Sequence, residues 1–87
     1  MEKHYVYIIY SDSRNLYYKG YSKRPYVRLL EHNEGKSKYT KDKGPWELIF
    51  LQVFSTKSEA LKREKSLKRS NSKYLMWVIQ QDYNIVG

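Results

Sequence analysis

One carboxylate in the chain, Glu64, falls at a position where helical periodicity predicts an inward side chain. It comes four residues after Ala60 and three before Leu67, so all three share one face of a helix. An isolated carboxylate is costly to bury, and Glu64 must therefore be paired, solvated in a cleft or bound to a cation. An ion pair with a nearby Lys or Arg is the common outcome, and a bound cation is the functional alternative.

Arg28 and His32 form a second candidate pair. They lie four residues apart in a segment that Pro25 opens as a helix, so their side chains share one face. The pair combines a permanent cation with a group that titrates near neutral pH. An Arg/His pair at this spacing is more often a solvated surface, and that alternative stays open. His4 lies at the expected frayed start of the chain and receives no role.

Tyrosines are more frequent than packing requires, with ten in 87 residues. In a strand, Tyr5 and Tyr7 point to one face, whereas Val6 and Ile8 point to the other. A second tyrosine-rich run contains Gly20, and a glycine inside a strand often marks the close approach of a ligand or another chain segment. An aromatic core with one bulge is the structural alternative.

The composition narrows the classes of function. Seventeen Lys and Arg against nine Asp and Glu leave a formal charge of +8, concentrated in residues 36–43 and 57–73. This charge suits a polyanionic partner such as nucleic acid, although small proteins are also basic for solubility alone. The absence of cysteine excludes disulfides, thiolate zinc sites and cysteine nucleophiles. There is no apolar run of about 20 residues and no signal-peptide pattern, and we expect a cytoplasmic location.

Local signals divide residues 1–87 into six elements of one domain. Apolar and aromatic runs at 5–10 and 16–21 predict a hairpin, and a third strand follows at 46–54. Helices are predicted at 24–34, after the Thr56/Glu59 capping box, and at 73–81. The order β-β-α-β-α-α predicts an α+β fold, a three-stranded and mainly antiparallel sheet flanked by helices. The expected inward side chains of the last two helices are Ala60, Leu61, Leu67, Leu75, Met76, Val78 and Ile79.

Six stretches occur in a distinctive order along the chain. They are Tyr5-Val6-Tyr7, Tyr18-Lys19-Gly20, the Arg28 and His32 pair, Gly35-Lys36-Ser37-Lys38-Tyr39-Thr40, Gly44-Pro45, and residues 59–68 with Glu64. In this order they resemble the GIY-YIG nuclease family, in particular its small stand-alone bacterial members. These are related to the N-terminal nuclease domain of the excision-repair excinuclease. The resemblance covers residue 5 to about residue 80.

The resemblance implies a divalent-metal phosphodiesterase that acts on nucleic acid, DNA rather than RNA, without an organic cofactor. Glu64 would be the sole protein ligand of one Mg²⁺ or Mn²⁺ ion, and Arg28 would bind a phosphate oxygen. Tyr7 or Tyr18 would take the proton of water. His32 would orient a tyrosine or carry a proton.

The same resemblance implies supporting roles for further residues. Gly20 and Asn33 would be structural parts of the motifs. The expected nucleic-acid contacts are Lys19, Lys36, Lys38, Tyr39, Thr40, Lys41 and Lys68.

Three departures from the family pattern bear on activity. Tyr5 stands where the first motif usually has glycine, and Lys19 replaces a hydrophobic residue in the second. The asparagine that larger members carry about three turns after the glutamate is missing, and Asn71 is too close to replace it. Two alternatives to a nuclease therefore remain: a nucleic-acid-binding module of the same fold with weak or lost catalysis, and a protein-interaction domain whose charge is incidental.

Overall fold

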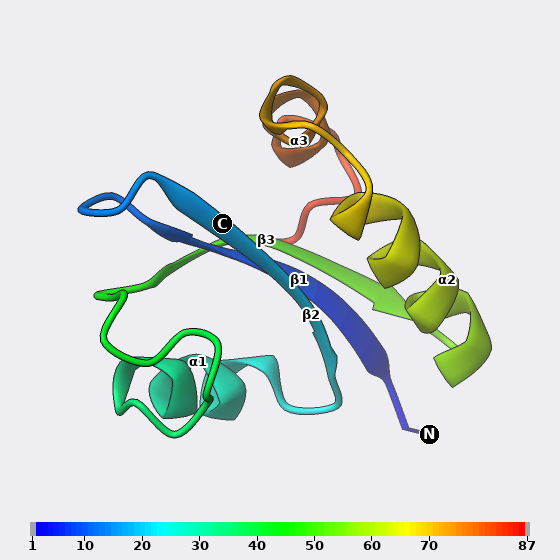
Figure 1. The fold of residues 1–87 in the computed structure, drawn as a ribbon. Coiled ribbons are helices and arrows are strands. Elements are labelled where there is room, and N and C mark those ends of the chain that lie inside the picture. The colour runs from blue at the N-terminus through cyan, green and yellow to red at the C-terminus, as the bar shows by residue number, and fades with distance from the viewer. Residues whose placement is uncertain (1, 87) are drawn as a thin grey trace.

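Three antiparallel strands form a sheet in the order β2-β1-β3, in a computed structural model that describes residues 2–86. The strands are β1 (His4–Ser11), β2 (Leu16–Ser22) and β3 (Glu47–Phe54). The helices are α1 (Pro25–Asn33), α2 (Lys57–Lys68) and α3 (Ser72–Ile79). The predicted α+β fold and element order are confirmed, with small shifts at the ends of elements. Figure 1 shows α1 on one side of the sheet and α2 with α3 on the other.

The register of the sheet decides which side chains face which helices. In the β1–β2 pair, Tyr7 lies opposite Gly20 and Ile9 opposite Tyr18. The one irregularity in the pairing of β1 with β3 falls between Ile8 and Ile9, so the expected bulge is not at Gly20. Because side chains alternate along a strand, the odd-numbered residues of β1 face α1 and the even-numbered ones face α2 and α3.

The larger core lies between the sheet and the pair α2 and α3. Its buried members are Val6, Ile8, Phe50, Ala60, Leu67, Leu75 and Val78. Two helix side chains that we expected to point inward do not: Leu61 is 40% exposed and Met76 is 55% exposed. These predictions were wrong because each helix buries a stripe narrower than its apolar sequence allows, with Ala60 and Leu67 alone buried on α2.

The smaller core lies on the α1 side and supports the polar residues described below. Tyr7, Ile9, Trp46 and Leu51 form it, and Leu29 of α1 packs against it. Trp46 lies just before β3 begins, where the third strand was predicted to start. The segment between α1 and β3 therefore closes over this face through a buried aromatic anchor.

The helix starts are set by local chemistry. Thr56 accepts a hydrogen bond from the backbone N–H of Glu59 at 3.2 Å, which confirms the Thr56 half of the predicted capping box. The Glu59 carboxylate accepts from the Thr56 hydroxyl at 3.0 Å instead of from its backbone N–H. Asn71 caps α3 by accepting from the backbone N–H of Tyr74 at 2.8 Å. At α1, Pro25 occupies the first turn, and the preceding turn is closed by the Arg24 N–H donating to Ser22 Oγ at 2.9 Å.

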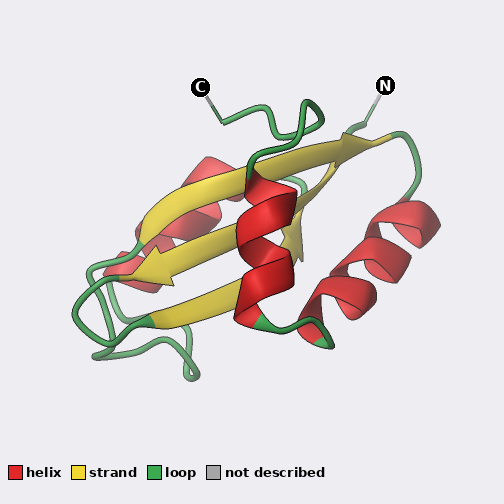
Figure 2. Ribbon diagram, turned by 90° about the horizontal axis from the view of Figure 1, so that it is seen from above, coloured by secondary structure: helices red, strands yellow, loops and turns green. Residues whose placement is uncertain are grey.

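The segment after α3 returns along the outer edge of β3, and Figure 2 shows α3 itself lying across the strands. The side chain of Asn84 accepts from the N–H of Leu51 at 3.0 Å and donates to the carbonyl of Ile49 at 3.0 Å. The Ile85 N–H adds a bond to the Leu51 carbonyl at 2.8 Å. Among residues 2–86, none of the helices combines the length and apolar character that a membrane crossing requires.

Candidate active site at the edge of the sheet

Tyr7 lies at the centre of the candidate site. Its side chain crosses the neighbouring strand β2 directly over Gly20, where a Cβ atom would overlap the phenol ring and hydroxyl. Glycine is therefore required at position 20 because a side chain, rather than a ligand, approaches its backbone. Tyr7 is only 2% exposed, yet its hydroxyl reaches the outer edge strand of the sheet.

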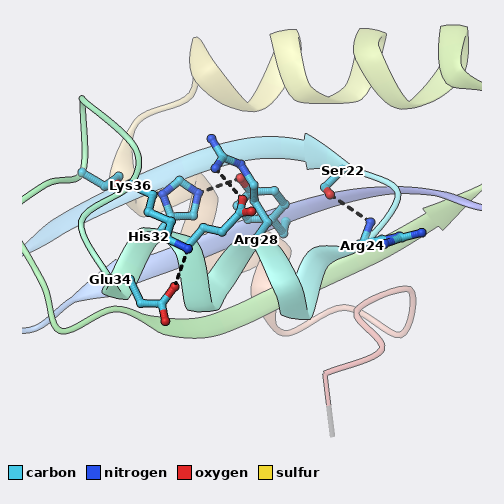
Figure 3. Close-up of polar contacts among 9 residues, drawn as sticks. Ser22, Arg24, Arg28, His32, Glu34 and Lys36 are labelled. Carbon is cyan, nitrogen blue, oxygen red and sulfur yellow. Dashed lines mark hydrogen bonds and ion pairs between the residues drawn. The ribbon is translucent and has the colours of Figure 1, made fainter.

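A buried chain of hydrogen bonds connects Tyr7 to the loop after α1. Its hydroxyl lies 2.9 Å from Nε2 of His32, and His32 Nδ1 lies 2.7 Å from Oγ1 of Thr40. His32 is 1% exposed, so the solvated-surface interpretation of this residue is wrong (Figure 3). Thr40 is fully buried as well. The prediction that Thr40 contacts nucleic acid is therefore wrong, because its hydroxyl is used inside the protein to hold His32.

The loop that carries Thr40 is fixed at its far end by Asn33 and Trp46. The Trp46 indole N–H donates to the Thr40 carbonyl at 3.2 Å. Asn33 accepts from the backbone N–H of Trp46 at 2.6 Å and donates to its carbonyl at 3.1 Å, as a strand residue would. Asn33 thus ties the last turn of α1 to the start of β3 and sets the position of Thr40.

Tyr18 completes an aromatic group around His32. Its ring centroid lies 5.0 Å from that of His32, 6.4 Å from that of Tyr7 and 5.5 Å from that of Tyr39. Tyr18 opens into a surface hollow of about 350 Å³, which we call the aromatic hollow; it is lined by Tyr17, Tyr18, Lys19, Tyr39 and Lys68.

Of the residues expected to contact nucleic acid, Lys19, Tyr39 and Lys68 thus converge on one surface. Burial and the nearby charge of Lys68 lower the pKa of Lys19, as expected for two ammonium groups that face the same space. Lys36 instead pairs with Glu34 at 3.3 Å on the exposed end of α1 (Figure 3). Lys38 and Lys41 lie on the exposed surface of the loop, outside this hollow.

Arg28 projects from α1 toward the same edge of the sheet. Its guanidinium is half-buried and donates to Glu31 at 2.9 Å, a pairing between residues three apart. Partial burial by itself would lower the pKa of Arg28. Glu31, Tyr7 and Tyr18 have the opposite effect and outweigh it, so that the pKa of Arg28 is raised. The spacing of Arg28 and Glu31 could have revealed this pair from the sequence.

Glu64 approaches from α2, on the opposite side of the sheet. Its side chain is 18% exposed and pairs with Lys68 at 3.4 Å, so the ion-pair interpretation holds. That pair lies beside the tyrosines, because Lys68 lines the aromatic hollow. Burial raises the pKa of the Tyr7 hydroxyl, Tyr18 and Glu64 add to this, and Arg28 opposes it. Arg28 and Glu64, from two helices on opposite faces of the sheet, thus act on the same hydroxyl.

The state of His32 follows from its surroundings. Burial and the neighbouring charge of Arg28 lower its pKa to about 4, against a weaker opposing effect of Glu31. His32 is therefore neutral at neutral pH, and its ring can accept a hydrogen bond at one nitrogen while donating one at the other. Nε2 can thus accept the hydrogen bond of the Tyr7 hydroxyl while Nδ1–H donates to Thr40.

The described residues limit how a metal ion could bind. Residues 2–86 contain no cluster of three or more histidine or carboxylate side chains that could enclose an ion. Glu64 is the carboxylate whose charge acts on Tyr7, and Glu31 is engaged by Arg28. A single carboxylate suits Mg²⁺, which retains several waters and binds proteins through one or two carboxylates plus substrate phosphate.

The contact of Thr40 with His32 could not be predicted from the sequence. Thr40 follows His32 by eight residues, across the end of a helix and a loop, where no periodicity relates two positions. Asn71, which we excluded as a replacement for the missing asparagine, is engaged as the cap of α3. His4 is ordered in β1 rather than frayed: its ring stacks on Tyr21, with Nδ1 at 2.7 Å from the Tyr21 hydroxyl.

Comparison with known families agrees with this architecture. The family of the GIY-YIG catalytic domain matches residues 3–77, which is most of the chain. The chain therefore belongs to the GIY-YIG family of nuclease domains.

Its relatives include small bacterial proteins of similar length. It is 43% identical over 82 residues to a UPF0213 protein of Staphylococcus epidermidis, covering 93% of this chain and 99% of that protein. It is 46% identical over 69 residues to a UPF0213 protein of Staphylococcus saprophyticus, covering 78% and 83%. The solution NMR structure of a UPF0213 protein from Bacillus halodurans aligns with a TM-score of 0.59 at 29% identity, covering 93% of this chain and 86% of that one. The predicted likeness to small stand-alone members is confirmed.

Proposed function

We propose that the protein is a metal-dependent endonuclease that hydrolyses phosphodiester bonds in nucleic acid, with DNA as the substrate to test first. One observation carries the proposal. The Tyr7 hydroxyl is hydrogen-bonded to His32 and is under the electrostatic influence of both Arg28 and Glu64. A cation-binding carboxylate, a phosphate-binding guanidinium and a proton acceptor are the groups that phosphodiester hydrolysis needs, and they converge here.

Glu64 would hold Mg²⁺ or Mn²⁺, and that ion would polarise the scissile phosphate and stabilise the leaving oxygen. The pair with Lys68 does not prevent this. Lys68 is 53% exposed, so water can solvate its ammonium group when it leaves Glu64, and the incoming cation replaces its charge beside the carboxylate. Lys68 can therefore turn from Glu64 to a substrate phosphate at little cost in free energy.

Tyr7 and His32 would move the proton of the attacking water. As the water oxygen bonds to phosphorus, its proton passes to the Tyr7 oxygen, and the Tyr7 proton passes to Nε2 of His32. Because burial raises the pKa of Tyr7 and lowers that of His32, both are neutral at rest, and the transfers must be concerted. The protonated ring would then donate from Nδ1 to Thr40, whose hydroxyl lies 2.7 Å away.

Arg28 would bind a non-bridging oxygen of the phosphate as its negative charge grows. The bond to Glu31 uses one nitrogen of the guanidinium, Nη1, and leaves other donors of the fork for the substrate. The same positive charge lowers the pKa of Tyr7 and so makes the tyrosine a better proton relay. Tyr18, at the mouth of the aromatic hollow, would contact the nucleotide next to the reacting phosphate.

A nucleic-acid-binding module remains the second candidate. Two observations favour it: the family asparagine has no replacement, since Asn71 caps α3, and the proposed metal ligand is paired with Lys68. Both candidates require binding to nucleic acid, and they differ only in whether metal-dependent cleavage follows.

The substitution Glu64→Gln tests the proposal, with Glu47→Gln as the matched control because Glu47 is exposed at the start of β3. Wild type and control should cut a labelled oligonucleotide in Mg²⁺ or Mn²⁺ and melt at a higher temperature with metal, whereas Glu64→Gln should do neither. Equal metal responses in all three proteins would remove Glu64 as the ligand. Binding without cleavage by wild type would establish the second candidate, and failure to bind any nucleic acid at low salt would leave the protein-interaction alternative.

A further inference from the structure

A second hollow, of about 470 Å³, lies beside the candidate active site, and we call it the cationic hollow. Side chains from the end of β2, the following turn, α1 and the first residue of α2 line it. Four of these side chains are basic: Lys23, Arg24, Arg28 and Lys57. Apart from Arg28, none of them has a part in the proposed reaction, although they share a surface with it.

The positive charge of this hollow is only partly neutralised. Arg28 pairs with Glu31 and Lys23 pairs with Glu2 at 2.7 Å. Arg24 and Lys57 form no ion pair with any residue in the range 2–86. Because α1 and α2 both begin here, the positive ends of two helix dipoles add to the two unpaired cations.

One of these cations is held in place by a short series of contacts. The Lys57 ammonium lies 5.9 Å from the ring centroid of Tyr21. Tyr21 is in turn fixed by His4, which stacks on its ring and is hydrogen-bonded to its hydroxyl. This weak cation–π contact at the surface favours a position of the Lys57 ammonium beside the hollow.

The two hollows follow one another along β2 and α2. The aromatic hollow involves Tyr17 to Lys19 of β2 and Lys68 at the end of α2. The cationic hollow involves the end of β2 and Lys57 at the beginning of α2. The strand and the helix therefore run in opposite directions past the same surface. Lys68 follows Lys57 by eleven positions in one helix, which corresponds to about 16 Å along its axis.

The proposed catalytic groups connect the two hollows, because Tyr18 lines the aromatic hollow and Arg28 lines the cationic hollow. Glu64 pairs with Lys68, which borders the aromatic hollow, and Arg28 lines the cationic hollow. Figure 3 shows the Arg28 side chain extending from α1 toward the side of β2 on which α2 lies. A strand passing through the site would therefore meet tyrosines on one side of the reacting phosphate and unpaired cations on the other.

We infer that the cationic hollow is a phosphate subsite, which holds a phosphodiester group of the nucleic-acid strand on one side of the cleavage position. This inference rests on the proposed function and specifies how its substrate lies. The forked donors of Arg24 match the oxygens of a phosphate, and Lys57 supplies a second positive charge. Bases flanking the cleavage position on the other side contact Tyr18 and Tyr39 in the aromatic hollow.

The test compares two double variants that remove the same charges. Arg24→Gln/Lys57→Gln removes the unpaired cations of the hollow. Arg14→Gln/Lys62→Gln removes an exposed Arg and an exposed Lys that line neither hollow. Binding of a fluorescent oligonucleotide is measured by anisotropy without divalent metal, over a series of salt concentrations, and cleavage is measured separately in Mg²⁺.

The salt dependence identifies the phosphate contact. Each lost phosphate contact reduces the slope of log K against log salt by about 0.7 for a single strand and about 0.9 for a duplex. The hollow variant should lose about one such increment, and the control should keep the wild-type slope. Equal slopes in the two double variants, with wild type still binding and cutting, would overturn the subsite alone. Absence of nucleic-acid binding by wild type would instead overturn the proposed function.

Discussion

At the residue scale, the most informative feature is that the buried polar groups of the site satisfy one another. Tyr7, His32 and Thr40 are all buried, and each has a hydrogen-bond partner. No buried side-chain nitrogen or oxygen in residues 2–86 lacks one. A fully satisfied network in a region of low dielectric holds its members in one geometry, which proton transfer requires.

His32 makes the stability of the protein depend on pH in a defined direction. Its pKa falls from an ordinary value of 6.5 to about 4 in the folded protein. As the pH falls through this interval, the unfolded chain takes up a proton that the folded protein does not, so stability is lost on acidification. Between pH 7 and pH 4.5 the loss from this residue is about 2 kcal/mol.

His32→Gln removes this titration while keeping a polar side chain at the position. Urea unfolding of both proteins at pH 7 and pH 4.5 measures the effect. The free energy of unfolding of wild type should fall by about 2 kcal/mol more than that of the variant over this interval, since all other groups titrate in both proteins. Losses of equal size would mean that folded His32 accepts a proton as readily as the unfolded chain does.

Arg28→Lys separates a phosphate-binding fork from a simple surface charge. Lysine keeps the positive charge but lacks the forked donors, so contacts that strengthen in the transition state are lost. We expect single-turnover cleavage to slow by about 10²–10³ while substrate affinity changes little. Arg14→Lys, in the exposed turn after β1, is the matched control and should cut at the wild-type rate. A variant at position 28 that cuts as fast as this control would remove Arg28 from the reaction.

At the scale of elements, the strands and helices were predictable because their signals are local. The alternation of side chains in β1 separates the two cores correctly, with Val6 and Ile8 in one and Tyr7 in the other. The capping box at Thr56 places the start of α2. The width of each buried helix stripe was not predictable, since Leu61 and Met76 would be buried only if a further element covered them.

The candidate site was predictable in its members but only partly in its geometry. From the order of the motifs we predicted that one site contains Tyr7, Tyr18, Arg28, His32 and Glu64. In the structure these side chains lie near one another, toward the β2 edge of the sheet. The burial of His32 depends on the loop of residues 34–46, which folds back through Thr40 and Trp46. A loop that folds over a helix has no regular spacing of apolar residues in the sequence. We therefore predicted Thr40, which lies among lysines, to be a surface residue.

At the scale of the whole molecule, the sheet separates the main apolar core from the polar residues of the candidate site. Its α2 and α3 side holds the larger apolar core, and its α1 side holds the smaller core with the buried polar network. The candidate site lies along β2, one edge of the sheet, where groups from both sides meet. An edge strand suits this purpose because a long extended substrate can pass along it without displacing either core.

The opposite edge of the sheet is β3, and the way it is covered bears on self-association of the protein. An uncovered edge strand offers unpaired N–H and carbonyl groups on which another chain can add a strand, a common start of aggregation. In the middle of β3, Asn84 occupies the Leu51 N–H and the Ile49 carbonyl, and the backbone of Ile85 occupies the Leu51 carbonyl. The segment after α3 thus covers this part of the edge and hinders a second molecule from adding a strand to β3.

Asn84→Ala should weaken this protection by freeing the Leu51 N–H and the Ile49 carbonyl on β3. Asn84→Asp keeps the acceptor for Leu51 and Val86 and loses the two donor bonds, to the Ile49 and Ile79 carbonyls. We expect sedimentation and light scattering at rising protein concentration to show more self-association than wild type for Ala, and an intermediate increase for Asp. Unchanged behaviour of both variants would mean that Ile85 alone shields the edge. If Asn84→Ala does self-associate more than wild type, a single polar side chain limits the concentration at which this protein stays free of aggregates.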